Sequence, residues 1–192
     1  VEDYLSGGFP AEPYRDDQYE MVEAFHAWEA DHDIEVLSLE RTVFGSNYAG
    51  TADFFARIDG KVTLVDWKTS SAIRDSHKMQ LAAIGAAITT AREVPEGTPN
   101  AVPHQLQPKV SEEHGGQKIA WFVEEPLPDF EQYSVVQIRP SDYSNQGEYI
   151  PAFCKMHVIP SRQIDAAFKL FTAAVDARLA QYELKQLEKE ES

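Results

Sequence analysis

The sequence predicts an α/β domain in which helices flank a central mixed β-sheet. Two observations carry this prediction. Helical and β-prone segments alternate along the 192 residues in the order helix, strands, helix, strands, helix. In addition, Asp59-Gly60 lies between two β-prone runs and marks a tight hairpin. The length suits one domain, so we expect residues 1–192 to form a single unit.

The first half of the chain is expected to supply two helices and three strands. Residues 1–15, with Gly-Gly and two prolines, predict an irregular acidic arm. Apolar residues at helical spacing predict a helix over 16–31, capped by Asp16 or Asp17. The segments that follow are a β-prone run at 34–44, a loop at 45–50, the hairpin at 51–69 and a helix at 75–92 with a cap at Asp75 or Ser76.

The second half of the chain is expected to add strands and one long helix. Residues 93–118 are rich in proline and poor in apolar side chains, which predicts a loop. Strands are expected at 118–125 and 133–140, and the sequence leaves open whether 151–159 is a further strand or irregular. A stripe of apolar residues predicts a C-terminal helix over 161–190.

Cysteine content and hydropathy limit the class of protein. The single cysteine, Cys154, excludes an internal disulfide and a four-cysteine zinc or iron–sulfur site. No apolar run approaches the length of a membrane-spanning helix. We therefore expect a cytoplasmic protein with no iron–sulfur cluster and no membrane partner.

The net charge of −15 argues against a general affinity for nucleic acid, but the charge is unevenly distributed. Residues 1–40 hold twelve acidic side chains and one arginine, whereas residues 41–92 hold seven basic and four acidic side chains. Because phosphate binding depends on local cations, the middle of the chain remains compatible with DNA. The acidic N-terminal region suggests a possible basic protein partner.

Charged residues interrupt the two apolar strands of the hairpin. If Asp59-Gly60 forms a two-residue loop, the register places Asp53 opposite Asp66. Lys68 then shares a face with Asp66, and Trp67 points the other way. Opposed carboxylates repel, and a hard divalent cation such as Mg²⁺ would relieve the repulsion.

A plain solvated face is the alternative reading of this hairpin, because Asp and Lys occur on many exposed strand faces. However, the same face also carries Phe55, Val62 and Leu64. We therefore favour a cation site over a solvated face.

Three short segments follow one another in strand–turn–strand–helix order, namely "GTAD" at 50–53, "DWKTS" at 66–70 and "HKMQLAAI" at 77–84. Together they resemble the PD-(D/E)XK nuclease superfamily, in particular its RecB-like and phage-encoded branch. The resemblance covers about residues 20–90. It implies a restriction-endonuclease-like core with a central mixed sheet, and hydrolysis of DNA phosphodiester bonds that depends on Mg²⁺ or Mn²⁺.

The resemblance also implies roles for particular residues. Asp53 and Asp66 correspond to the metal-binding carboxylates, and the main-chain carbonyl of Trp67 to a further metal ligand. Lys68 corresponds to the residue that positions the attacking water or helps to deprotonate it.

Three further positions match the family more loosely. Glu40, on the strand before the hairpin, corresponds to an acid near the metal, and an exposed strand glutamate is the alternative. Gln80 corresponds to a helix glutamine that supports the lysine or contacts DNA, and a generic helix glutamine is the alternative. His26 resembles a metal-binding histidine, but it also fits a packed or surface histidine, and Glu29 on the same face could contribute instead.

The leading functional hypothesis is a Mg²⁺- or Mn²⁺-dependent deoxyribonuclease that acts in phage or bacterial DNA processing or recombination, in the host cytoplasm if it is phage-encoded. Exonuclease is favoured over endonuclease by the resemblance alone. The second hypothesis is a catalytically quiet nuclease-fold module that binds a protein through its acidic surface. The sequence does not indicate an oligomeric state.

Overall fold

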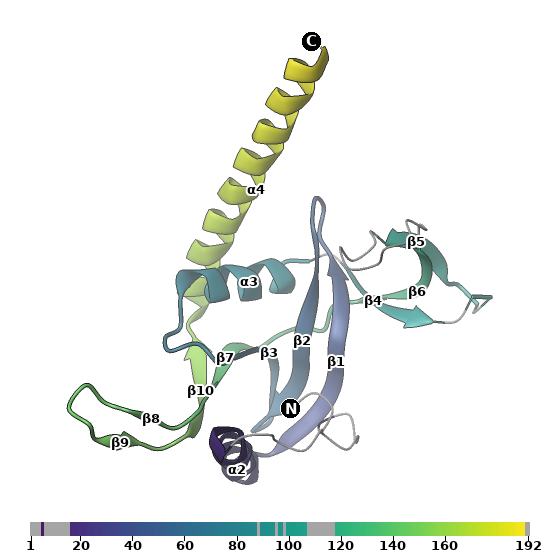
Figure 1. Ribbon diagram of the computed structural model, residues 1–192. Coiled ribbons are helices and arrows are strands. Elements are labelled where there is room, and N and C mark those ends of the chain that lie inside the picture. Colours follow the sequence, from purple (N-terminus) through teal and green to yellow (C-terminus); the bar gives the residue numbers. More distant parts are fainter. Residues whose placement is uncertain are drawn as a thin grey trace.

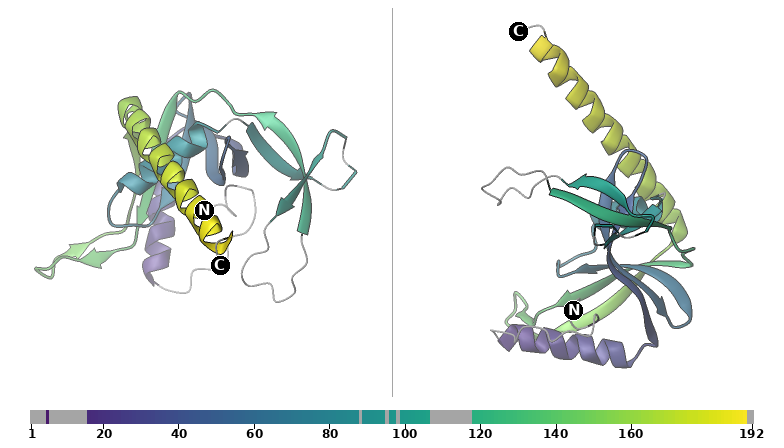
Figure 2. Two further views of the ribbon diagram at one scale, coloured as in Figure 1. Left: turned by 90° about the horizontal axis from the view of Figure 1, so that it is seen from above. Right: turned by 90° about the vertical axis from the view of Figure 1, so that its right-hand side faces the viewer.

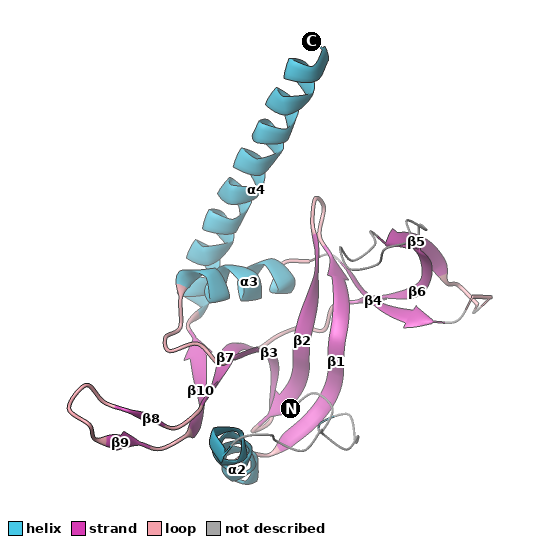
Figure 3. Cartoon of the chain, in the orientation of Figure 1, coloured by secondary structure: helices cyan, strands magenta, loops and turns pink. Residues whose placement is uncertain are grey.

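A mixed β-sheet of eight strands forms the centre of the protein in the computed structural model (Figures 1 and 3). The structure describes residue 5 and residues 16–87, 89–94, 96–97, 99–106 and 118–190. The strand order is β10-β7-β3-β2-β1-β4-β6-β5, and a small ribbon, β8-β9, stands apart. Only β3 and β7 pair in parallel within the described sheet, and its other neighbours are antiparallel.

Three helices accompany the sheet, namely α2 (Asp16–Ala30), α3 (Asp75–Gly85) and α4 (Ser161–Glu190). The first strands are β1 (Ile34–Phe44), β2 (Ala49–Ile58) and β3 (Lys61–Lys68). The remaining strands are β4 (Thr89–Val94), β5 (Val102–Leu106), β6 (Lys118–Pro126), β7 (Gln132–Arg139), β8 (Asp142–Tyr143), β9 (Tyr149–Ile150) and β10 (Phe153–Ile159). The predicted α/β class, the mixed sheet and the long C-terminal helix are confirmed.

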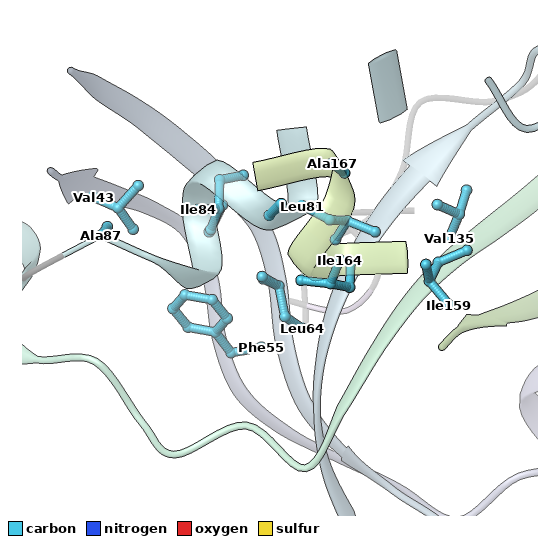
Figure 4. Close-up of a cluster of buried hydrophobic side chains, with 12 residues drawn as sticks. Val43, Phe55, Leu64, Leu81, Ile84, Ala87, Val135, Ile159, Ile164 and Ala167 are labelled. Atoms are coloured by element: carbon cyan, nitrogen blue, oxygen red, sulfur yellow. The ribbon is translucent and has the colours of Figure 1, made fainter. Parts of the chain in front are cut away.

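Helices cover both faces of the sheet, and each face has its own apolar core (Figure 2). On one face, α3 and the first turns of α4 pack on the sheet, as the close-up shows (Figure 4). That core includes Val43, Phe55, Leu64, Leu81, Ile84, Val135, Ile159 and Ile164. On the other face, α2 packs through Phe25 and Trp28 onto Phe54, Val65 and Val136. The later turns of α4 extend away from the sheet (Figure 1).

The turn between β2 and β3 has the geometry that its sequence predicts. Asp59 and Gly60 both have positive φ, 50° and 81°, as a type I′ turn requires. Ile58 pairs with Lys61, which confirms the predicted register. The Asp59 carboxylate accepts hydrogen bonds from His32 Nδ1 at 2.7 Å and from the Asp33 N–H at 3.0 Å, so the turn is fixed to the chain before β1.

Three sequence predictions need correction. The helix predicted over 75–92 ends at Gly85, and residues 89–94 form β4, because β-branched residues such as Thr89 and Thr90 favour a strand once the helix has ended. The loop predicted over 93–118 contains β5. The N-cap of α3 is Arg74 rather than Asp75 or Ser76.

The remaining predictions about elements have simpler outcomes. The sequence allows either a strand or irregular structure at 151–159, and the structure has strand β10 there. The arm predicted over 1–15 lies outside the described residues, apart from residue 5. Among the helices that the structure describes, none is both long enough and apolar enough to cross a membrane.

The turn geometry makes a prediction about stability. Gly60→Val places a β-branched residue at a φ of 81°, so we expect the free energy of unfolding to fall by about 1–2 kcal/mol. Gly60→Asn should lose less, because asparagine tolerates left-handed backbone better. Urea unfolding of both variants measures the difference. Equal losses would show that the backbone of this turn relaxes.

Candidate functional site

The candidate site lies where β2 and β3 separate. Their ladder runs from the turn to Phe54, which pairs with Val65. Beyond this row, β2 stays paired with β1 as far as Ala49, and β3 stays paired with β7 as far as Lys68. The register that pairs Phe54 with Val65 places Asp53 opposite Asp66 at the first row of the gap.

Asp53 takes over a hydrogen bond that the interrupted ladder no longer makes. If the β2–β3 ladder continued beyond Phe54 and Val65, Trp67 and Ala52 would form its next hydrogen-bonded pair, in which each backbone donates to the other. These two residues are not paired. Instead, the Trp67 N–H donates to Asp53 Oδ2 at 3.1 Å. The Trp67 carbonyl lies on the same edge of β3 as the Trp67 N–H, so it points toward β2 and the Asp53 carboxylate.

An aromatic cluster on the opposite face anchors this end of β3. The Trp67 ring stacks on Phe54 with centroids 5.5 Å apart, and it makes edge contacts with Trp28 and Phe25 of α2 at 5.9 and 6.0 Å. Because side chains alternate along a strand, anchoring Trp67 on the α2 face directs Asp66 and Lys68 to the α3 face.

Asp66 is a buried carboxylate that forms an ion pair with Lys68. Its side chain is 1% exposed, and Lys68 Nζ lies 2.6 Å from Oδ2. The Lys68 ammonium offsets the buried charge of Asp66, and among the described residues no other donor reaches the Asp66 oxygens. Burial raises the pKa of Asp66 to about 6, the Lys68 ammonium opposes this rise, and the Asp53 carboxylate adds to it.

Glu40 lies in register with the two aspartates. In β1, Leu39 pairs with Phe54 and Arg41 with Ala52, so Glu40 falls opposite Asp53. Its φ of 48° is unusual for a residue within a strand, and its side chain is exposed. Glu40, Asp53 and Asp66 thus occupy one row across β1, β2 and β3.

His26 and Gln80 lie on helices rather than in that row of strand residues. His26 belongs to α2, on the opposite face of the sheet, and its Nδ1 lies 3.4 Å from Glu29 Oε2. Gln80 is exposed on α3, one turn after His77. The pKa of His77 is lowered by burial and by the nearby cations Lys68 and Arg74, which places the first turn of α3 beside Lys68.

The donor set at the gap suits a hard cation that keeps part of its water shell. Among the described residues, no group of three or more His, Cys, Asp or Glu side chains could hold a metal ion. Asp53, Asp66 and the Trp67 carbonyl offer three oxygen donors, and among the described residues no donor other than Lys68 reaches the Asp66 oxygens. Mg²⁺ is typically held by one or two carboxylates together with several waters, so these residues fit it.

Two contributors to the site were missed by the sequence analysis. The sequence suggests a role for the Trp67 carbonyl as a metal ligand, but it does not show that the Trp67 ring anchors β3. Gln137 is the partner of Lys68 across the parallel pair and is 6% exposed. A signal for Gln137 exists, because it is a polar residue within the apolar strand "YSVVQI".

Comparison with known proteins adds no assignment. No protein-family model matches the chain, and no curated protein matches it.

The raised pKa of Asp66 predicts an unusual pH dependence of stability in metal-free buffer. The folded state binds the Asp66 proton more tightly than the unfolded state between its ordinary pKa of 3.8 and about 6. The contribution of Asp66 to the free energy of unfolding should therefore rise as the pH falls through that window. Thermal unfolding between about pH 7.5 and about pH 5 measures it.

Asp66→Asn is the control for this prediction, because it lacks the titrating group. The melting temperature of the parent relative to Asp66→Asn should increase toward low pH. Near neutral pH the variant should be slightly more stable than the parent, since a like-charge pair is gone. A constant difference across the range would contradict the raised pKa.

Proposed function

We propose that the chain is a divalent-metal-dependent deoxyribonuclease with a PD-(D/E)XK, restriction-endonuclease-like core. One observation carries the proposal. Two carboxylates, Asp53 and Asp66, meet where the strands separate, and the Lys68 ammonium lies 2.6 Å from Asp66. A purely structural sheet gains little from Asp66, because burying this carboxylate beside a second acid costs free energy even with Lys68 as its partner.

The chain's own groups suit hydrolysis of a phosphodiester. Asp53, Asp66 and the Trp67 carbonyl would hold Mg²⁺ or Mn²⁺, which supplies an acidified water and offsets the negative charge that develops on the phosphate. Lys68 is one fifth exposed, so its ammonium can reach both Asp66 and a bound substrate. Its role is to orient the attacking water or to accept its proton.

Basic side chains near the site support a phosphate-bearing substrate. Lys68 pairs with Gln137, and Gln137 pairs with Lys155, so both lysines lie in one row on the α3 face. Arg139 follows on the same face two residues after Gln137. These cations provide local attraction for a DNA backbone within a chain whose net charge is −15.

The direct test uses end-labelled linear DNA and closed circular DNA, single- and double-stranded, with and without Mn²⁺. We expect metal-dependent cleavage, and release of nucleotides from linear DNA alone would identify an exonuclease. Mn²⁺ should also raise the melting temperature of the parent, a readout that does not require activity. Mn²⁺ binding without cleavage of any DNA would support the catalytically quiet binding module instead.

The roles of Lys68 and Asp53 can be separated by substitution. Lys68→Ala should still bind Mn²⁺, and more tightly than the parent, because a competing cation is removed. Its cleavage rate should fall roughly 10²-fold or more, as expected for a lost proton-transfer group. Asp53→Ala should lose both Mn²⁺ binding and cleavage. Calorimetric Mn²⁺ titration beside a cleavage assay measures both properties.

A matched control for Lys68→Ala is Lys61→Ala, at the other end of the same strand. Lys61 is exposed next to the turn and remote from the gap between the strands. Its loss should leave Mn²⁺ binding and cleavage unchanged. Cleavage by Lys68→Ala at the parent rate would remove the nuclease assignment from this hairpin.

A further inference from the structure

Gln137 is a buried polar side chain beside the candidate catalytic lysine. It lies on β7, directly across the parallel pair from Lys68 and on the same face of the sheet. Its side chain is 6% exposed, and it lies next to the buried apolar residues Val136 and Ile138 of β7. A buried amide is costly unless both its ends are hydrogen-bonded, so its partners show what it holds.

Both ends of the Gln137 amide are engaged. Its Nε2 donates to the main-chain oxygen of Ser70 at 2.6 Å. Its Oε1 lies 3.2 Å from His157 Nε2 of the edge strand β10. Because an amide oxygen only accepts, His157 must carry its proton on Nε2. With this donor facing Gln137 Oε1, the amide nitrogen of Gln137 faces the Ser70 carbonyl.

The bond to Ser70 holds the chain just after the catalytic lysine. β3 ends at Lys68, and by then it has lost its pairing with β2, so β7 is its remaining ladder partner. Ser70 lies two residues further on, at the start of the irregular connection to α3. Gln137 therefore ties β7 to this segment at two points, through the ladder at Lys68 and through its side chain at Ser70.

We propose that Gln137, oriented by His157, is a positioning residue that fixes the backbone carrying Lys68 in the nuclease reaction. The inference rests on the proposed function for its catalytic consequence. A flexible lysine side chain can orient a water accurately only if its own Cα is held. A displacement of about 1 Å in such a group can lower the rate about 10²-fold.

Gln137→Met is the primary test, because it keeps the length of the side chain and removes both hydrogen bonds. We expect kcat for DNA cleavage to fall about tenfold or more, with little change in KM or in Mn²⁺ binding. The control is Gln132→Met on the same strand, whose amide contacts Ser134 far from Lys68. A Gln137→Met enzyme with the kcat of the control would overturn the proposal, as would a loss confined to KM.

Substitutions at His157 provide a rescue experiment. His157→Gln keeps a donor that can reach Gln137 Oε1, whereas His157→Phe removes it. We expect His157→Gln to retain most of the parent kcat and His157→Phe to lose activity in the same direction as Gln137→Met. Equal activities of the two His157 variants would show that this side chain does not orient Gln137.

Hydrogen exchange tests the structural part of the proposal without cleavage. In Gln137→Met the amides of residues 69–74 should exchange faster than in the parent, and in Gln132→Met they should not. Unchanged exchange would refute the tie between Gln137 and Ser70. If exchange is faster in Gln137→Met but the parent protein cleaves no DNA, the proposed function is contradicted. The hydrogen-bonded link between Gln137 and Ser70 is then still supported.

Discussion

Beyond the row of Phe54 and Val65, β2 follows β1 while β3 follows β7, and the geometry of the candidate site depends on this divergence. Two features of β1 promote it. The β1–β2 register shifts between Val36 and Ser38, and a bulge of this kind increases the local twist of a strand pair. Glu40 then adopts a left-handed backbone conformation in the row of Asp53. Both features border the point at which β2 and β3 separate, and in the gap the Asp53 side chain accepts the Trp67 N–H.

The gap explains why charge is tolerated at this point of an apolar sheet. The Asp53 carboxylate replaces a ladder partner for the Trp67 N–H, so one acid has a structural role in addition to its proposed chemical one. Asp66 is compensated only in part, because burial raises its pKa more than the Lys68 ammonium lowers it. Groups whose pKa is shifted by burial are common at functional sites, where reactivity is gained at the expense of stability.

The sequence predicted the parts of the structure that local interactions determine. Asp59 and Gly60 set the turn, the turn set the register, and the register placed Asp53 opposite Asp66. Long-range pairing was not readable in the same way. The parallel alignment of Lys68 with Gln137 joins residues from distant parts of the chain, and no local pattern encodes it. The end of α3 was also missed, because the alanine-rich helical pattern continues toward Thr89, where pairing of β4 with β1 and β6 overrides helix propensity.

The topology also separates the acidic helix α2 from the proposed substrate. The acidic helix α2, with Glu20 and Glu23, packs on the Trp67 face of the sheet, whereas Asp66, Lys68 and the neighbouring basic residues lie on the α3 face. Stacked layers in proteins lie about 10 Å apart, which is comparable to the Debye length of about 8 Å at physiological salt. Repulsion between α2 and a phosphate backbone on the α3 face is therefore largely screened. The five acidic side chains of α2 are compatible with a DNA-binding site on the α3 face because the sheet stands between them.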